Sequence, residues 1–161
     1  MRRSCLTIAT LVVAAVTLAS VAAAGREAAN QRVGITMRGL PNGTFVLAPL
    51  QSGALQRDSG TVRHTVANYT PRVVIRDGQR VSIFKPVVWL IDGRRGTLAI
   101  REPANRWVET GDAAIGTDTW KVVRGTGQYA QVTGGGRSAH VGHNGGTGAW
   151  FARQEGFLTS S

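Results

Sequence analysis

The sequence predicts an all-β protein whose strands close into a barrel. Apolar and polar residues alternate over short runs, and Gly, Pro, Asn and Asp separate these runs roughly every 8–12 residues. No window beyond residue 24 carries the i, i+3, i+4, i+7 spacing of an amphipathic helix. These observations are typical of a sandwich or a barrel. A barrel is favoured because closure removes unpaired strand edges.

Residues 1–24 have the pattern of a secretory signal peptide. Basic residues 2 and 3 precede an apolar run, Cys5–Ala19, which is too short for a good membrane span. Ala22–Ala24 fits a small-x-small cleavage site and predicts cleavage near Gly25. An uncleaved N-terminal anchor is the alternative.

Residues 25–161 then form a single domain with no expected transmembrane span. The only cysteine leaves with the signal peptide, so no disulfide is expected. An exported chain without disulfides suits a bacterial setting, either secreted or in the cell envelope.

The chain is strongly basic, with 19 Lys and Arg against 9 Asp and Glu and a net charge of +10. Such a charge would attract an anionic partner such as an envelope polymer. Beyond the signal peptide the basic residues are scattered, and Arg94–Arg95 is the only adjacent pair. Because basic runs and interleaved aromatic residues are lacking, nucleic-acid binding is not expected.

The first half of the domain predicts strands separated by turns. Val33, Ile35 and Met37 alternate with polar or small residues, which indicates a half-buried strand. Pro86 interrupts a long apolar run and predicts an edge, a bulge or a corner there. The strands are expected at 31–38, 44–50, 61–67, 72–76, 80–85 and up to residue 91, with hairpin turns at 77–78 and 92–93.

The second half continues this pattern. A strand over 96–102 places Leu98, Ile100 and Glu102 on one face. Residues 106–109 are a strand or a loop, and 111–118 are expected to be a connection. Further strands are expected at 120–124 and 129–133, followed by a glycine-rich segment to residue 148 and a final apolar run, 149–158, broken at 153–156.

The stretch Trp120–Gly136, WKVVRGTGQYAQVTGGG, carries the most specific pattern. It resembles the W-x-V-V-x-G-T-G-x-Y-A-x-x-T-G-x-G signature of the allene oxide cyclase and dirigent-like β-barrel superfamily, in particular its small exported bacterial members. The resemblance is close over these residues, looser over 93–96 and 148–158, and limited to strand character over 25–90.

This resemblance implies an eight-stranded antiparallel barrel with a lipocalin-like apolar interior. In the family the Gly-Thr-Gly is a structural corner, which would assign Gly125, Gly127 and the later Gly134 to tight backbone bends. The aromatic residue after the corner, Tyr129 here, would fill the barrel end.

The resemblance also implies a cavity that holds a reactive apolar ligand. Plant cyclases of this superfamily cyclise an unsaturated fatty-acid epoxide, and dirigent proteins orient phenoxy radicals. Their functional acids have no recognisable counterpart in residues 31–70. Either activity would therefore be carried over by fold analogy alone.

Two patterns match known functional motifs, but the residues around them do not fit those functions. Gly125-x-Gly127-x-x-Ala130 matches a dinucleotide fingerprint, but residues 131–136 cannot open the helix that this motif needs. Ser138 near His140 has no third member of a catalytic triad. No cofactor is expected.

The three histidines do not predict a metal site. On a strand, His140 and His143 would point to opposite faces, and neither a cysteine nor a neighbouring carboxylate accompanies them. They are interpreted as solvated loop residues, together with the separate His64, so no metal is expected.

The candidate catalytic residue is Glu102, which shares a face with Leu98 and Ile100. A buried position would raise its pKa and suit it to proton transfer. A rim position beside Pro103 is the favoured alternative.

The candidate ligand-binding residues are Trp89, Trp120, Arg124 and Tyr129. Tryptophans of a small barrel are more often core filler than ligand contacts, and Trp107 and Trp150 are interpreted in the same way. Arg124 would meet a carboxylate head group only if it shares an inward face with Trp120.

Three functions follow from the sequence. The leading one is an exported, non-enzymatic barrel that binds a small apolar or amphipathic molecule. The second is an isomerase or cyclase that acts on an oxidised lipid or terpenoid-like substrate through an inward acid. The third is a cationic protein that associates with anionic envelope polymers.

Overall fold

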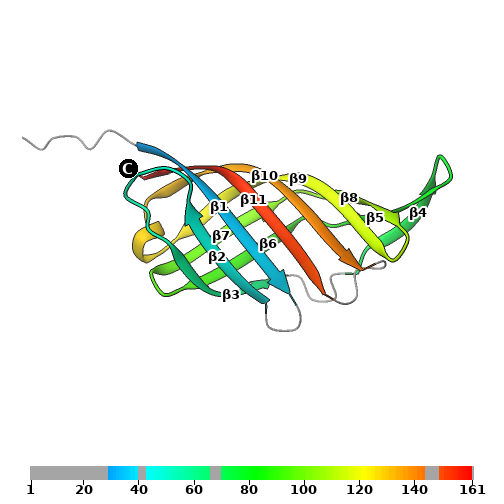
Figure 1. The fold of residues 1–161 in the computed structure, drawn as a ribbon, viewed down its shortest axis with the longest axis horizontal. Helices are drawn as coiled ribbons and strands as arrows, with labels where there is room; N and C mark the ends of the chain where they lie inside the picture. Colours follow the sequence, from blue (N-terminus) through cyan, green and yellow to red (C-terminus); the bar gives the residue numbers. More distant parts are fainter. Residues whose placement is uncertain (1–28, 40–42, 66–69, 144–148, 161) are drawn as a thin grey trace, which may run out of the picture.

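The computed structural model describes residues 29–39, 43–65, 70–143 and 149–160 as one continuous antiparallel sheet (Figure 1). The predicted signal peptide and its cleavage site lie outside these residues. The described elements are β1 (Ala29–Gly39), β2 (Gly43–Pro49), β3 (Asp58–His64), β4 (Arg72–Arg76), β5 (Gln79–Phe84), β6 (Val87–Gly93), β7 (Gly96–Glu102), β8 (Asn105–Thr110), β9 (Ala113–Gly125), the 3-10 helix η1 (Gly127–Tyr129), β10 (Val132–His143) and β11 (Trp150–Ser160).

The sheet closes on itself to form an eight-stranded barrel. Strands follow the order β10-β11-β1-β2-β3-β6-β7-β9, and β9 pairs back onto β10. The expected eight-stranded antiparallel barrel is therefore confirmed. Strands β8, β5 and β4 continue from β9 as an extension beyond one end of the barrel (Figure 1).

Two prolines separate this extension from the barrel. Pro86 lies between β5 and β6, and Pro103 lies between β7 and β8, where neither can donate a backbone hydrogen bond to a ladder. Strand β9 therefore has two different partners along one edge. Its residues Ala113–Gly116 pair with β8, and its residues Lys121–Gly125 pair with β7. Residues 117–120 of β9 lie opposite this break in the barrel wall, which we call the split.

Four sequence predictions in this region are wrong. Residues 111–118 are not a connection but largely the first half of β9, and the expected strand at 129–133 gives way to η1 and the start of β10. The glycine-rich segment is mostly strand β10, and β11 is unbroken across 153–156. A Cβ on Gly136 would lie 2.0 Å from the Glu155 carbonyl oxygen, so glycine here allows close contact between strands rather than a turn.

The Gly-Thr-Gly connects β9 to η1, and of its two glycines Gly127 has a positive φ whereas Gly125 is the last residue of β9. Gly127 has φ +57°, and a Cβ there would lie 2.2 Å from the carbonyl oxygen of Arg95. Thr126 donates its backbone N–H to Thr97 and accepts the Thr97 N–H on its hydroxyl oxygen. Gly134 also has a positive φ but lies inside β10, so its assignment to a corner is corrected.

Gly127→Ala is expected to destabilise the protein more than Gly111→Ala. Both glycines have a positive φ, at +57° and +55°, but the space around Gly111 is open. The strain of a left-handed alanine costs about 1–3 kcal/mol in each variant, and only Gly127→Ala adds a backbone clash. Urea unfolding of both variants measures the difference, and equal losses would contradict a structural role for the corner.

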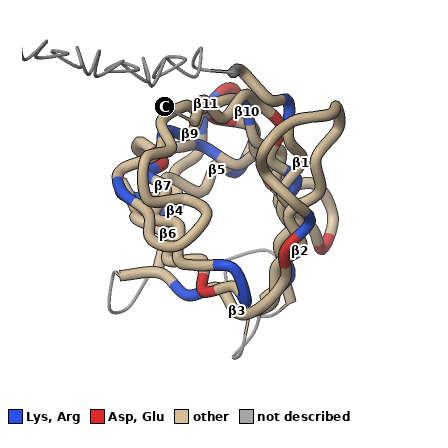
Figure 2. The backbone as a smooth tube through the Cα atoms, turned by 90° about the vertical axis from the view of Figure 1, so that its left-hand side faces the viewer, with Lys and Arg blue, Asp and Glu red and all other residues tan. Residues whose placement is uncertain are grey.

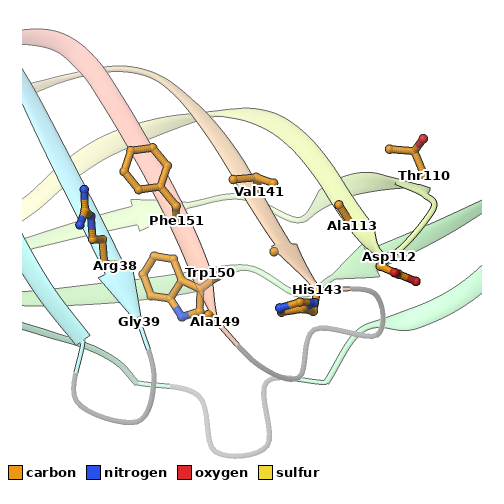
Figure 3. A pocket seen from close by; sticks show the side chains of 11 residues that line it. Arg38, Gly39, Thr110, Asp112, Ala113, Val141, His143, Ala149, Trp150 and Phe151 are labelled. Carbon is orange, nitrogen blue, oxygen red and sulfur yellow. The ribbon is translucent and has the colours of Figure 1, made fainter.

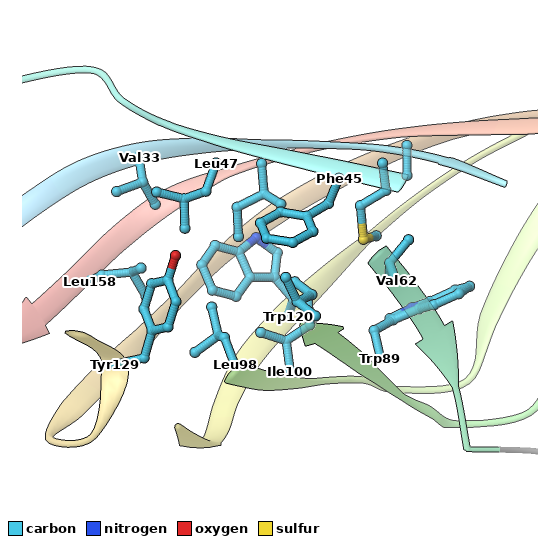
Figure 4. Close-up of a cluster of buried hydrophobic side chains, with 14 of the residues drawn as sticks. Val33, Phe45, Leu47, Val62, Trp89, Leu98, Ile100, Trp120, Tyr129 and Leu158 are labelled. Carbon is cyan, nitrogen blue, oxygen red and sulfur yellow. The ribbon is translucent and has the colours of Figure 1, made fainter. Parts of the chain in front are cut away.

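Apolar side chains fill the end of the barrel beside η1, which we call the closed end (Figure 4). Trp120 lies centrally in this cluster, with Leu98 and Tyr129 beside it. The Tyr129 hydroxyl donates to Asp58 (3.0 Å), and burial raises the pKa of Tyr129. This half of the interior is a packed core.

Charged residues lie around the whole barrel wall rather than on one side (Figure 2). Among the described residues, no helix has the length and apolar character needed to cross a membrane.

Candidate functional site

A network of polar side chains crosses the barrel interior between the closed end and the opposite, open end, where Gly39 and Trp150 lie at the strand termini. The network lies at the split. Glu102 is the last residue of β7 and Asn105 is the first residue of β8. Asp118 comes from the part of β9 that pairs with neither β7 nor β8. The other members come from β10 and β11 and are Ser138, His140 and Gln154.

Glu102 is one of the two acids of this network, and its side chain is 1% exposed. Trp89 donates its indole N–H to Oε2 (2.7 Å), and Gln154 donates its amide N–H to Oε1 (2.7 Å). Both oxygens therefore accept hydrogen bonds from buried donors. These bonds fix the orientation of the carboxyl group toward His140.

His140 lies between two carboxyl groups. Its Nε2 is 3.5 Å from Oε1 of Glu102 and 3.5 Å from Oδ2 of Asp118, without the alignment of a hydrogen bond to either. Asp118 also accepts hydrogen bonds from the Ser138 hydroxyl and the Asn105 amide. One ring nitrogen and two acidic oxygens thus converge in a site shielded from solvent.

The interactions within this network favour the charged forms of His140 and Asp118, although both side chains are buried. Burial by itself would lower the pKa of His140, but Asp118 and Glu102 raise it to about 9. Burial by itself would raise the pKa of Asp118, but His140, Ser138 and Asn105 hold it below its ordinary value. The two carboxyl groups therefore favour the imidazolium form of His140, which can donate a proton.

Several atoms of the network have no hydrogen-bond partner among the described residues. These buried atoms are Asn105 Oδ1, Trp107 Nε1, His140 Nε2 and Gln154 Oε1. They belong to one connected group, because Trp107 stacks on His140 at 5.2 Å between ring centroids and the others contact Asp118 or Glu102. Two are acceptors and two are donors.

Aromatic side chains connect this network to the open end. The Trp150 ring lies 5.0 Å from Trp89, and Gly142 provides room between Trp150 and Trp107. Trp150 also borders a hollow of about 540 Å³ on the outer side of the wall, which is lined by outward-facing residues such as Arg38, Val141 and Phe151 (Figure 3).

The structure separates the residues predicted to bind a ligand. Trp89, Trp120 and Tyr129 all belong to the buried apolar cluster, and Trp89 in addition donates a hydrogen bond to Glu102 of the network, whereas Arg124 lies apart from them. Arg124 is exposed on the outside, because a β-bulge pairs Ala99 with Arg124 but Ile100 with Val122. The bulge removes Arg124 from the inward face of Trp120.

Two favoured interpretations of the sequence are wrong. Glu102 is a buried residue and not a rim residue. Strand β8 continues the sheet beyond Pro103, and the paired strands β9 and β10 cover the Glu102 side chain. His140 is not a solvated loop residue but a buried residue of β10, while His143 is exposed as alternation requires. No metal was expected from the sequence, yet Glu102, Asp118 and His140 bring three potential ligand atoms within 4.8 Å of one another.

The sequence analysis missed Asp118, Asn105 and Gln154, and it set aside Ser138, whose hydroxyl donates to Asp118. Extending the alternation of Trp120 backwards would have placed Asp118 on the inward face of the same strand. Ser138 shares the parity of His140 on β10. The residue pattern within each strand does not show which other strand it will pair with, so the sequence could not place these residues together.

Comparison of the chain with protein-family models, with curated proteins and with solved structures finds no match.

Proposed function

We propose that the protein binds a small, largely apolar molecule through the open half of its barrel. The observation that carries this proposal is the set of buried donors and acceptors without partners, Asn105 Oδ1, Trp107 Nε1, His140 Nε2 and Gln154 Oε1. An unsatisfied buried polar atom costs about 1–3 kcal/mol, so such atoms are usually paired by water or a ligand. A ligand group that both donates and accepts would relieve several of them.

The aromatic residues of the open half support the apolar part of this proposal. The Trp150 ring lies 5.0 Å from the Trp89 ring, and Trp89 donates to Glu102, so aromatic surface extends from the polar network to this end of the barrel. Ligand pockets of proteins are mainly apolar with a few converging polar groups, and this half of the barrel has that composition.

The charges of the network favour a neutral polar group on the ligand. Glu102 and Asp118 would repel a carboxylate, and Arg124, the expected partner for one, lies on the outside of the barrel. A hydroxyl or an amide can instead donate to Gln154 Oε1 and accept from Trp107 Nε1. We therefore propose an alcohol, phenol or amide with an apolar body, in the exported setting that the N-terminal pattern predicts.

Binding of 4-butylphenol, butylbenzene and 4-butylbenzoate, measured by tryptophan fluorescence, tests this function. We expect 4-butylphenol to bind at least about tenfold more tightly than butylbenzene, because the hydroxyl satisfies buried partners. We expect 4-butylbenzoate to bind most weakly because its charge meets two carboxyl groups.

Matched glutamine variants locate the binding. Gln154→Leu should reduce the preference for the phenol, whereas Gln128→Leu at the closed end should leave it unchanged. Equal binding of all three compounds to the unmodified protein would refute the proposal, whatever the stability of the variants.

A second candidate function is an isomerase or cyclase, and the burial of Glu102 beside His140 favours it. In this function the His140 imidazolium would donate a proton to an oxygen of an oxidised lipid or terpenoid-like substrate, and Glu102 would accept one from carbon. Glu102→Gln would then abolish turnover and leave ligand binding intact. Association with anionic envelope polymers rests on the net charge alone.

A further inference from the structure

We propose that Glu102, Asp118 and His140 form a binding site for one divalent transition-metal ion of the zinc type. Each residue directs one potential ligand atom into the same buried region, and the three atoms lie within 4.8 Å of one another. The ligands come from β7, β9 and β10, which meet at the split. This inference goes beyond the binding of an organic ligand and does not depend on it.

Two of the three separations between the donor atoms, both measured from His140 Nε2, fit tetrahedral coordination. His140 Nε2 lies 3.5 Å from Glu102 Oε1 and 3.5 Å from Asp118 Oδ2. Tetrahedral zinc has bonds of about 2.0–2.2 Å to nitrogen and oxygen, which place neighbouring ligand atoms about 3.3–3.6 Å apart. Direct hydrogen bonds would have brought these atoms to about 2.7–3.0 Å.

The environment of the His140 nitrogen gives a second and independent indication. The side chain is 1% exposed, yet Nε2 has no hydrogen-bond partner among the described residues and lies at equal distance from two acidic oxygens. A buried donor or ligand atom in this position requires a counterpart. A metal ion bound between the three side chains supplies one.

A second shell of hydrogen bonds orients the carboxyl ligands. Trp89 and Gln154 hold Glu102, while Ser138 and Asn105 hold Asp118. Such outer contacts are characteristic of metal sites, where they fix the orientation and the basicity of the ligands. They leave Glu102 Oε1 and Asp118 Oδ2 directed toward His140.

The chemistry of the donors selects the class of metal. Binding of the metal ion displaces the Nε2 proton of His140 to solvent. Two carboxylates and the resulting neutral imidazole carry a total charge of −2, which a divalent cation neutralises in a buried site. An imidazole ligand favours Zn²⁺, Co²⁺ or Ni²⁺ over Ca²⁺ and Mg²⁺, which prefer oxygen. With three protein ligands, the fourth position would remain open to water or a ligand group.

Calorimetric titration of Zn²⁺ into the purified, chelator-treated protein at pH 7.5 tests this site. We expect one equivalent to bind with micromolar or tighter affinity and Mg²⁺ to give no signal. Removal of outer-shell partners weakens metal sites about 10–100-fold, so His140→Gln, which removes a ligand, should weaken binding at least about 100-fold. His143→Gln is the matched control, because His143 is exposed on the same strand.

Cobalt substitution of the unmodified protein provides a second measurement that does not depend on the folding of a variant. We expect one bound Co²⁺ to give the intense visible absorption of tetrahedral coordination, and Zn²⁺ to displace it. Absence of Zn²⁺ binding, weak octahedral Co²⁺ spectra, or Zn²⁺ affinity that His140→Gln leaves unchanged would each overturn the proposal.

Discussion

Trp120→Ala is expected to lower the free energy of unfolding by about 3–5 kcal/mol. Trp120 is 1% exposed and lies in the centre of the closed end, and its indole N–H donates to the Arg137 carbonyl oxygen at 3.2 Å. Alanine would leave a cavity that the surrounding strands cannot close, because each is fixed by its ladder on both sides.

Urea unfolding monitored by far-ultraviolet circular dichroism measures this loss. Val123→Ala is the control on the same strand, because Val123 is 54% exposed on the outer face and should change the stability by less than about 0.5 kcal/mol. Trp120→Phe should fall between the two, since it keeps a ring but loses the hydrogen bond. A loss below 1 kcal/mol for Trp120→Ala would show that the closed end is not a packed core.

Glu102→Ala is expected to lower the free energy of unfolding of the metal-free protein by about 3–5 kcal/mol. The change deprives the Trp89 indole and the Gln154 amide of their acceptor, and each buried donor left without a partner costs about 1–3 kcal/mol. Loss of the carboxyl group also leaves space inside the barrel.

Glu102→Gln separates hydrogen bonding from volume, because it preserves the size and one carbonyl oxygen. We expect it to cost about 1–3 kcal/mol, clearly less than alanine. Thermal unfolding in the presence of EDTA would compare the two variants with the unmodified protein. If both variants were as stable as the unmodified protein, the polar network would have no structural role.

The class of fold and most strand positions could be predicted from local patterns. The alternation around Val33 and Ile35, the hairpin turn at Asp77–Gly78 and the break at Pro86 all agree with the structure, whereas the turn expected at 92–93 lies two residues later, at 94–95. These features depend on side-chain periodicity and backbone preferences, which short segments carry by themselves.

The glycine-rich half was harder to interpret because glycine has two structural uses. At Gly127 it permits a positive φ and marks a true corner. At Gly136 and Gly156 it permits neighbouring strands to approach within van der Waals contact inside regular β-structure. Composition alone does not distinguish these uses, so β10 was interpreted as irregular.

The candidate site depended on tertiary structure for a different reason. Glu102, Asp118, His140 and Gln154 come from separate strands, and none lies in a motif with fixed spacing. Each one read alone resembled an ordinary rim, connection or loop residue. Barrel closure, which pairs β9 with β10, and the split between β7 and β8 bring them together.

The sequence by itself therefore determined that the chain is all-β, that its strands form a barrel and that the Gly-Thr-Gly is a corner, because these properties follow from local periodicity and steric limits. Only the tertiary structure decided that Glu102 and His140 are buried partners and that Arg124 is outside. Burial depends on which strands become neighbours, and a single β-bulge or proline break reverses the face that a residue presents.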